Sequence, residues 1–220
     1  VVEFPAAALM GQGSDNLPAV DAAVAAIRRA TLASKVYVLF GATTHTRTQM
    51  KNVNWMLVLA PDGRELLRYD KLYDQPTAPM PGVFNIDGIP CGTMICADRW
   101  LRGIEEIPIQ QGAKVSFELS CNSSVEWVAP LGWYWYGPRA VRNNVWVVFA
   151  NTGNTVSGVP PYPGATLRHG HSAIIAPDGR MVASSPDDVA TVVMAEIDVR
   201  EATRTEALAR SSHPALRAFW

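Results

Sequence analysis

The sequence predicts an α/β domain in which two packed sheets are covered by outer helices. Short apolar segments typical of strands alternate with helical patterns along the chain, and strands outnumber helices. The pentapeptide Ala-Pro-Asp-Gly-Arg occurs twice, at Ala60–Arg64 and Ala176–Arg180, each time between two strand patterns, which indicates two similarly built halves. Because no linker interrupts the 220 residues, we expect a single domain spanning residues 1–220.

In the first half, a helix and a hairpin are the clearest elements. Asp15 or Asn16 can cap a helix that has Pro18 in its first turn, and the apolar stripe of this helix runs to about Ala33. An Asp-Gly turn signal joins the two arms of the hairpin. The strands expected here are Val1–Phe4, Lys35–Gly41, Trp55–Ala60 and Glu65–Lys71.

The second half repeats the same alternation. One helix is expected between Asp98 and Gly112, and another at Pro138–Asn143. The second Ala-Pro-Asp-Gly-Arg turn again closes a hairpin. The strands expected here are Val83–Ile86, Cys91–Cys96, Val115–Leu119, Val145–Asn151, His171–Ala176, Met181–Ser184 and Val192–Ile197.

Composition and charge exclude several classes of function. Hydrophobic residues make up 48% of the chain, charged residues 18%, and the net charge is −1, so we expect neither a nucleic-acid surface nor attraction to a membrane. The three cysteines form no CxxC pair and the four histidines complete no zinc pattern with them, so no metal site is predicted. This cysteine usage favours a reducing compartment, the cytoplasm.

Cys96 is the candidate for chemistry. It follows a buried strand, where the chain turns toward a helix, and functional side chains often lie at this position in α/β domains. A thiol at that place can be activated by nearby positive charge, and Lys71, at the end of a hairpin strand, is the candidate cation. By itself, a cysteine at a strand end is more often a small buried apolar residue, and this remains the interpretation of Cys91 and Cys121.

The pattern around these two residues resembles the nitrilase, or carbon–nitrogen hydrolase, superfamily. The resembling blocks lie in the family's order and cover almost the whole chain. They are Arg68–Leu72, Met80–Gly82, Gly92–Trp100, Gln111–Ala113, Arg139–Asn143, Ala150–Gly153, Gly170–Ala173 and Ala195–Asp198.

The resemblance implies a four-layer α-β-β-α sandwich and a Glu-Lys-Cys catalytic triad. Cys96 would attack a non-peptide amide, carbamoyl or ureido carbon to give a thioester, and Lys71 with the N–H of Ala97 would hold the oxyanion. Trp100, Arg142 and Glu118 are the candidate substrate-binding residues. No metal or organic cofactor is implied, and a homodimer or higher homo-oligomer is expected. The resemblance also implies that one strand and one helix should precede Val1.

The general base can be aligned in two ways. One alignment, without a gap, places Ala6 where the family has its glutamate, which would leave the thiol without a base. The other places Glu3 at the strand end and completes a triad of Glu3, Lys71 and Cys96. Two further departures are Arg142, where the family usually has a glutamate, and the absence of a second Glu between Lys71 and Cys96, for which Asp74 is the possible substitute.

Three alternatives to an amide hydrolase stay open. An N-acyltransferase would let an amine rather than water attack the thioester. A catalytically impaired pseudoenzyme or binding protein would follow from the loss of the base at Ala6. Cys96 could also serve as a redox-sensing thiol, which would not require Lys71 beside it. The aromatic residues Trp127, Trp133, Tyr134 and Trp135 could line a pocket, a core or a subunit contact.

Overall fold

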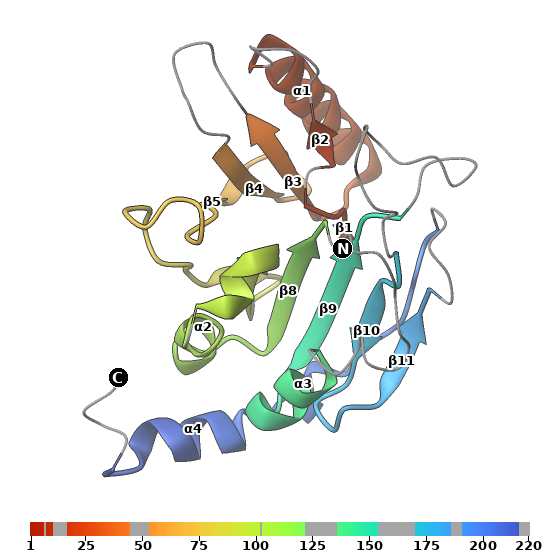
Figure 1. Ribbon diagram of the computed structural model, residues 1–220. Helices are drawn as coiled ribbons and strands as arrows, with labels where there is room; N and C mark the ends of the chain where they lie inside the picture. The colour runs from red at the N-terminus through yellow and green to blue at the C-terminus, as the bar shows by residue number, and fades with distance from the viewer. Residues whose placement is uncertain are drawn as a thin grey trace.

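The computed structural model of the protein contains two β-sheets that face each other, with helices on both outer faces (Figure 1). It describes residues 1–6, 8–10, 17–44, 53–101, 103–121, 136–153, 170–185 and 191–215. Within these residues, no helix is both long and apolar enough to cross a membrane.

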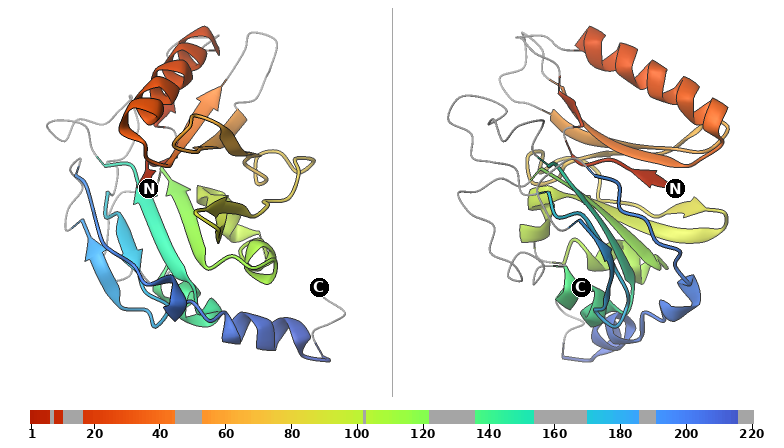
Figure 2. Two further views of the ribbon diagram at one scale, coloured as in Figure 1. Left: turned by 180° about the vertical axis from the view of Figure 1, so that it is seen from behind. Right: turned by 90° about the vertical axis from the view of Figure 1, so that its right-hand side faces the viewer.

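The first sheet is built from the N-terminal third of the chain. Its strands follow the order β1-β3-β4-β5, and β2 also pairs with β3. Helix α1 carries the apolar stripe expected from the sequence and packs on the outer face of this sheet, as the right-hand view of Figure 2 shows. The elements are β1 (Val2–Glu3), β2 (Leu9–Met10), α1 (Leu17–Ser34), β3 (Val38–Thr44), β4 (Val53–Leu59) and β5 (Glu65–Asp70).

The second sheet has the order β11-β10-β9-β8-β7-β6, and its central strands β7, β8 and β9 are parallel. Its strands are β6 (Phe84–Ile86), β7 (Ile89–Ile95), β8 (Val115–Ser120), β9 (Trp146–Asn151), β10 (Ala173–Ile175) and β11 (Met181–Ser184). The helical segments of this half are η1 (Cys96–Trp100), α2 (Glu106–Gln110), α3 (Gly137–Asn143), η4 (Val199–Glu201) and α4 (Thr205–Ser212).

Three hydrophobic clusters correspond to the three contacts between layers. One joins α1 to the first sheet, and one joins α2, α3 and α4 to the second sheet. The third and largest lies between the sheets, and along β8 it takes Val115, Phe117 and Leu119. Because successive side chains of a strand point to opposite faces, Ser116 and Glu118 face the helices instead. The order of layers is therefore α-β-β-α, as expected.

The two Ala-Pro-Asp-Gly-Arg segments form the same turn in the two sheets. The N–H of Ala60 donates to the carbonyl of Arg64 at 2.8 Å, and the N–H of Ala176 donates to that of Arg180 at 2.9 Å. The turn glycines adopt φ angles of 77° and 85°, which residues with a Cβ rarely adopt. Both hairpins, β4–β5 and β10–β11, also shift register close to the turn.

Several predicted strands form with shifted ends, such as β3 at Val38–Thr44 instead of Lys35–Gly41, and one predicted strand does not form. Val192–Ile197 was expected to pair, but residues 191–198 run without a strand assignment. Val192 and Met194 are 82% and 81% exposed, whereas Val193 and Ile197 pack against the cluster between the sheets. One face of the segment therefore packs against the core between the sheets. No strand in the described part of the chain forms backbone hydrogen-bond pairing with it.

Candidate active site

Cys96 lies at the carboxyl end of β7, where the strand turns into η1. Residues 91–95 of this strand are buried within the second sheet, and Cys96 itself is half-buried. Its φ angle is 48°, in the left-handed region that a residue with a Cβ adopts at a cost. Backbone strain of this kind clusters at functional sites, so the conformation of Cys96 is consistent with a functional role for this residue.

Asp98 fixes the turn that presents Cys96. Its side chain is fully buried, and one carboxylate oxygen accepts hydrogen bonds from the Tyr69 hydroxyl at 2.8 Å and the Ile95 N–H at 3.0 Å. The other oxygen accepts from the Tyr73 N–H at 2.8 Å. Burial raises the pKa of Asp98, while these bonds and the nearby charge of Lys71 act in the opposite direction. Asp98 thus joins the Cys96 turn to the end of the first sheet.

Lys71 directly follows β5, and its N–H donates to the carbonyl of Asn54 at 2.8 Å. Its ammonium Nζ lies 3.0 Å from a carboxylate oxygen of Asp74, and the same oxygen accepts from the Asn54 amide at 2.7 Å. Only 11% of the Lys71 side chain is exposed. Asp74, considered from the sequence as a substitute for a family glutamate, therefore does contact Lys71.

Glu3 has an unusual environment. Both oxygens of its carboxylate are buried, and neither has a hydrogen-bond partner among the residues that the structure describes. Burial, followed by the negative charge of Glu118, raises the pKa of Glu3 well above its ordinary value. A carboxyl whose pKa is raised in this way takes up a proton more readily than an ordinary carboxyl, which is a property that a general base needs.

Strand register, however, separates Glu3 from Lys71. Glu3 pairs with Leu39 of β3, whereas Asn54, the partner of Lys71, pairs with Thr43. Positions 39 and 43 are four residues apart, which is about 13 Å along a strand at roughly 3.3 Å per residue. The N-terminal segment runs parallel to β3, so Ala6 lies closer than Glu3 to the end of the sheet where Lys71 lies.

Ala6 is buried between the sheets near the end of the second sheet. It is 6% exposed, and the Thr152 hydroxyl donates to its carbonyl at 3.4 Å. Thr152 directly follows β9, and the ends of β7, β8 and β9 are in register, with Ile95 opposite Leu119. Strand register therefore favours Ala6 as the position that corresponds to the family's base. The buried carboxylate of Glu3, with its raised pKa, favours Glu3 instead.

The remaining candidate residues lie in different places. Ala97 is half-buried in η1, and Trp100 is exposed, with the Arg99 guanidinium 5.4 Å from its ring centre. Arg142, on α3, pairs with Glu105 and, at 2.6 Å, with Glu106, in the helical layer rather than beside Cys96. Trp127, Trp133, Tyr134 and Trp135 lie outside the described residues.

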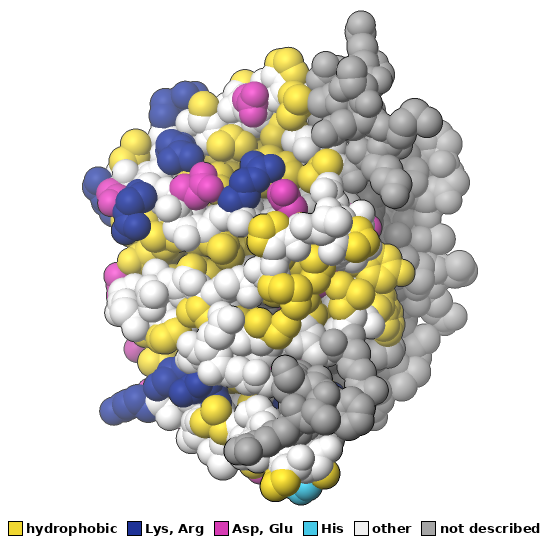
Figure 3. Space-filling view, turned by 90° about the vertical axis from the view of Figure 1, so that its left-hand side faces the viewer, with side chains coloured by type: hydrophobic (Ala, Val, Ile, Leu, Met, Phe, Trp, Pro, Cys, Tyr) yellow, Lys and Arg dark blue, Asp and Glu magenta, His cyan; other side chains and the backbone are white. Residues whose placement is uncertain are grey.

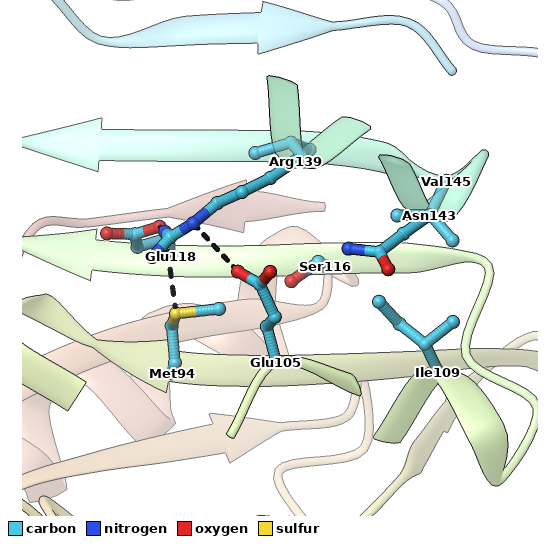
Figure 4. A pocket seen from close by; sticks show the side chains of 9 residues that line it. Met94, Glu105, Ile109, Ser116, Glu118, Arg139, Asn143 and Val145 are labelled. Carbon is cyan, nitrogen blue, oxygen red and sulfur yellow. Dashed lines mark hydrogen bonds and ion pairs between the residues drawn. The ribbon is translucent and has the colours of Figure 1, made fainter. Parts of the chain in front are cut away.

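Glu118 belongs to a charged cluster between the second sheet and its helices. Its side chain is 1% exposed and pairs with Arg99 at 3.2 Å and with Arg139 at 2.7 Å. Arg139 also pairs with Glu105 at 2.7 Å, and Glu105, Glu118 and Arg139 border a small pocket (Figure 4). In the sequence, Asp98, Arg99 and Arg139 stand out only as parts of the resembling blocks, because their partners come from distant segments.

Comparison with known structures shows the same fold. An amidase from Nesterenkonia sp. AN1 superposes with a TM-score of 0.76 and 17% sequence identity, covering 100% of this chain and 86% of that chain. A cysteine-to-alanine mutant of that amidase in complex with butyramide matches with a TM-score of 0.76 and 15% identity, covering 100% and 83%. A glutamate-to-glutamine mutant, in which the acetamide moiety of fluoroacetamide is covalently added at the active-site cysteine, matches with a TM-score of 0.76 and 16% identity, with the same coverage.

Sequence comparison identifies the family. No curated protein sequence matches the chain. Residues 1–207, nearly the full length, match the family described as carbon-nitrogen hydrolase. The chain therefore belongs to the carbon–nitrogen hydrolase family of the nitrilase superfamily.

Proposed function

We propose that this protein hydrolyses a small linear amide, carbamoyl or ureido compound, with Cys96 as nucleophile. The observation that carries the proposal is the turn at Cys96, whose left-handed backbone is joined through the buried Asp98 to Tyr69, two residues before the cationic Lys71. A half-buried thiol near positive charge is the environment in which cysteines become reactive. The covalent chemistry described for the Nesterenkonia amidase supports the same assignment.

The reaction would proceed in two steps. The Cys96 sulfur attacks the carbonyl carbon, and the Lys71 ammonium and the Ala97 N–H stabilise the negative oxygen that forms. The carbon–nitrogen bond then breaks, ammonia or an amine leaves with a proton, and a thioester remains on Cys96. Water hydrolyses the thioester and frees the acid. Glu3 is the proposed base: it takes the thiol proton and gives it to the leaving nitrogen, then takes a proton from the attacking water and gives it to the Cys96 sulfur as the thioester breaks.

Intact-mass spectrometry tests the nucleophile. The protein is mixed with a panel of small amides and quenched in acid, and ammonia release is measured in parallel. We expect an acyl adduct and ammonia from the wild type and neither from Cys96→Ala. Ammonia release that persists in Cys96→Ala, or a complete panel without adduct or ammonia, would refute the proposal.

A pseudoenzyme is the second candidate, and the buried Ala6 at the level of Thr152 favours it. Two variants separate the candidates. If Glu3 is the base, Glu3→Gln should lower the turnover rate by about two to four orders of magnitude and Ala6→Glu should not raise it. If the base has been lost, Glu3→Gln should change little and Ala6→Glu should increase turnover.

We also propose a homo-oligomer in a reducing compartment. Hydrophobic side chains spread across the face that lies on the β5 side of the molecule (Figure 3), and Tyr73 and Met80, which follow β5, are 50% and 53% exposed. Exposed apolar surface of this kind is typical of subunit contacts. A chain with three cysteines and no CxxC pair suits the cytoplasm. Light scattering at several protein concentrations tests the assembly.

A further inference from the structure

A short series of hydrogen bonds leads from strand β3 to the ammonium group of Lys71. The Nζ of Lys71 lies 3.0 Å from one oxygen of Asp74, and the side-chain amide of Asn54 donates to that same oxygen at 2.7 Å. The Thr43 hydroxyl in turn donates to the side-chain oxygen of Asn54 at 2.6 Å. Each link between Thr43 and Lys71 is therefore a direct contact at hydrogen-bond distance.

Asn54 lies on the face of the first sheet that is turned toward the second sheet. Along β4, Val58 and Met56 belong to the apolar cluster between the sheets, and Asn54 is the next residue on that face. Thr43 is the residue paired with Asn54 on β3, and it is only 6% exposed. The apolar interior thus gives way to polar side chains at the end of the sheet where Lys71 lies, and this polar end is still shielded from solvent.

The partners of Asn54 fix the orientation of its side-chain amide. A carboxylate that pairs with an ammonium group only accepts hydrogen bonds, so Asp74 must face the NH2 group, and the amide oxygen faces the Thr43 hydroxyl. Asn54 is joined to Lys71 a second time, because its backbone carbonyl accepts from the Lys71 N–H at 2.8 Å. One residue therefore holds the backbone of Lys71 directly and the ammonium group through Asp74.

This arrangement matters because a lysine side chain is long and flexible. Ordering it costs rotamer entropy, and an ammonium group that is already aimed stabilises a new negative charge better than one that must first be ordered. The bond to Asp74 uses only one of the N–H donors of Lys71, so the carboxylate can aim the ammonium group without saturating it. Asp74 lies in the loop after β5, and the bond from Asn54 fastens its carboxylate to the sheet.

We propose that Asn54 is a positioning residue that, through Asp74, aims the Lys71 ammonium group at the oxyanion formed when Cys96 attacks a carbonyl. This inference rests on the proposed function, in which Lys71 stabilises that oxyanion. A hydrogen bond needs a separation of about 2.7–3.2 Å and a nearly straight angle, so it depends strongly on aim. The attraction between the Lys71 charge and a thiolate depends much less on aim, because Coulomb energy falls only with the inverse of distance.

Two reagents separate these effects on the purified full chain. With p-nitrophenyl acetate, the Cys96 sulfur forms a thioester through an oxyanion, p-nitrophenolate leaves, and the thiol proton passes to the buffer. With iodoacetamide, the same sulfur forms a thioether without an oxyanion, and iodide leaves. Mass spectrometry of the Cys96 peptide gives both rates. We expect Asn54→Ala to lower the acetylation rate about tenfold and to keep the alkylation rate within about twofold of the wild type.

Thr44→Val is the matched control. Thr44 is the neighbour of Thr43 on β3, is 7% exposed, and accepts a hydrogen bond from the Trp55 indole at 3.2 Å. Trp55 packs in the cluster beneath helix α1, so this pair lies on the opposite face of the same sheet. Thr44→Val removes a buried hydrogen bond of the first sheet and should leave both rates unchanged.

A double variant shows whether Asn54 acts through Asp74. In an Asp74→Asn background, the added Asn54→Ala change should lower acetylation by less than about twofold, because the route to Lys71 is already broken. Losses that multiply in full would mean that Asn54 acts by another route, and the positioning role would be wrong. Should Asn54→Ala fail to fold, Asn54→Ser makes the same comparison, because its hydroxyl is one bond further from Asp74.

An unchanged acetylation rate in folded Asn54→Ala, or acetylation and alkylation that fall together, would overturn the inference. Its failure can be separated from failure of the proposed function. Ammonia release from an amide by the wild type, with unchanged acetylation in Asn54→Ala, would leave the hydrolase and remove the role of Asn54. A selective loss of acetylation in Asn54→Ala, without ammonia from any amide, would do the reverse. A wild type in which Cys96 is not acetylated would overturn both.

Discussion

The left-handed backbone at Cys96 should make this residue a source of instability that glycine relieves. At a φ of 48°, a residue with a Cβ is strained by roughly 1–2 kcal/mol. Glycine avoids this strain but adds about 0.5–1 kcal/mol of unfolded-state entropy. Cys96→Gly should therefore be more stable than Cys96→Ala by about 0.5–1 kcal/mol. For a chain of 220 residues, this corresponds to an increase in Tm of about 1–3 °C.

The comparison uses two variants that both lack the thiol, so loss of sulfur packing cancels. Urea and thermal unfolding followed by circular dichroism give the free energies. Lys35 offers a matched pair, because it follows helix α1 with a φ of 57° and is exposed. Lys35→Gly should exceed Lys35→Ala by a similar amount. If the Lys35 pair shows the gain and the Cys96 pair shows none, the backbone at Cys96 is not strained and the reasoning fails.

Three further predictions concern groups elsewhere in the structure. Because burial raises the folded-state pKa of Glu3, its contribution to stability is present below the unfolded pKa and is lost as pH rises through the folded pKa. Glu3→Gln should therefore gain stability over the wild type from pH 5 to pH 8, and parallel urea midpoints across this range would contradict the prediction. Burial raises the pKa of Cys91 to about 12, so iodoacetamide at pH 8 should modify Cys96 and leave Cys91 unmodified until urea is added; equal labelling of the two in the folded protein would be inconsistent with this. A Cβ on Gly92 would lie 2.6 Å from the Cβ of Pro108, so Gly92→Ala should lower the free energy of unfolding by about 1–3 kcal/mol; an unchanged urea midpoint would show that the contact yields freely.

Features that depend on neighbouring residues in the chain were predictable from the sequence. The hairpin β4–β5 and the position of Cys96 at the end of β7 followed from local apolar runs and from turn residues. The order of layers followed from the alternation of strands and helices and from the family resemblance. These signals are short-range, so they survive without knowledge of the rest of the fold.

Features that depend on pairing between distant segments were not predictable. Arg142 binds Glu105 and Glu106 across two helices, and nothing in its own motif indicates those partners. The level of Glu3 is also set by long-range register. Glu3 pairs with Leu39 and Leu9 pairs with Ala42, so the N-terminal segment advances six residues while β3 advances three. This irregular pairing cannot be read from the sequence of the segment alone.

The two matching hairpins have a consequence for the order of folding. Paired residues within them are close in the chain, as Trp55 and Asp70 are, and hairpins of this kind form within about 1–10 μs. The parallel strands join residues much farther apart, such as Val115 and Trp146, and such pairing is slow because a long loop must close first. We expect pulsed hydrogen exchange to protect the hairpins early and β7 to β9 late. Cys96, at the end of β7, would then reach its final surroundings only when the rest of the protein is almost complete.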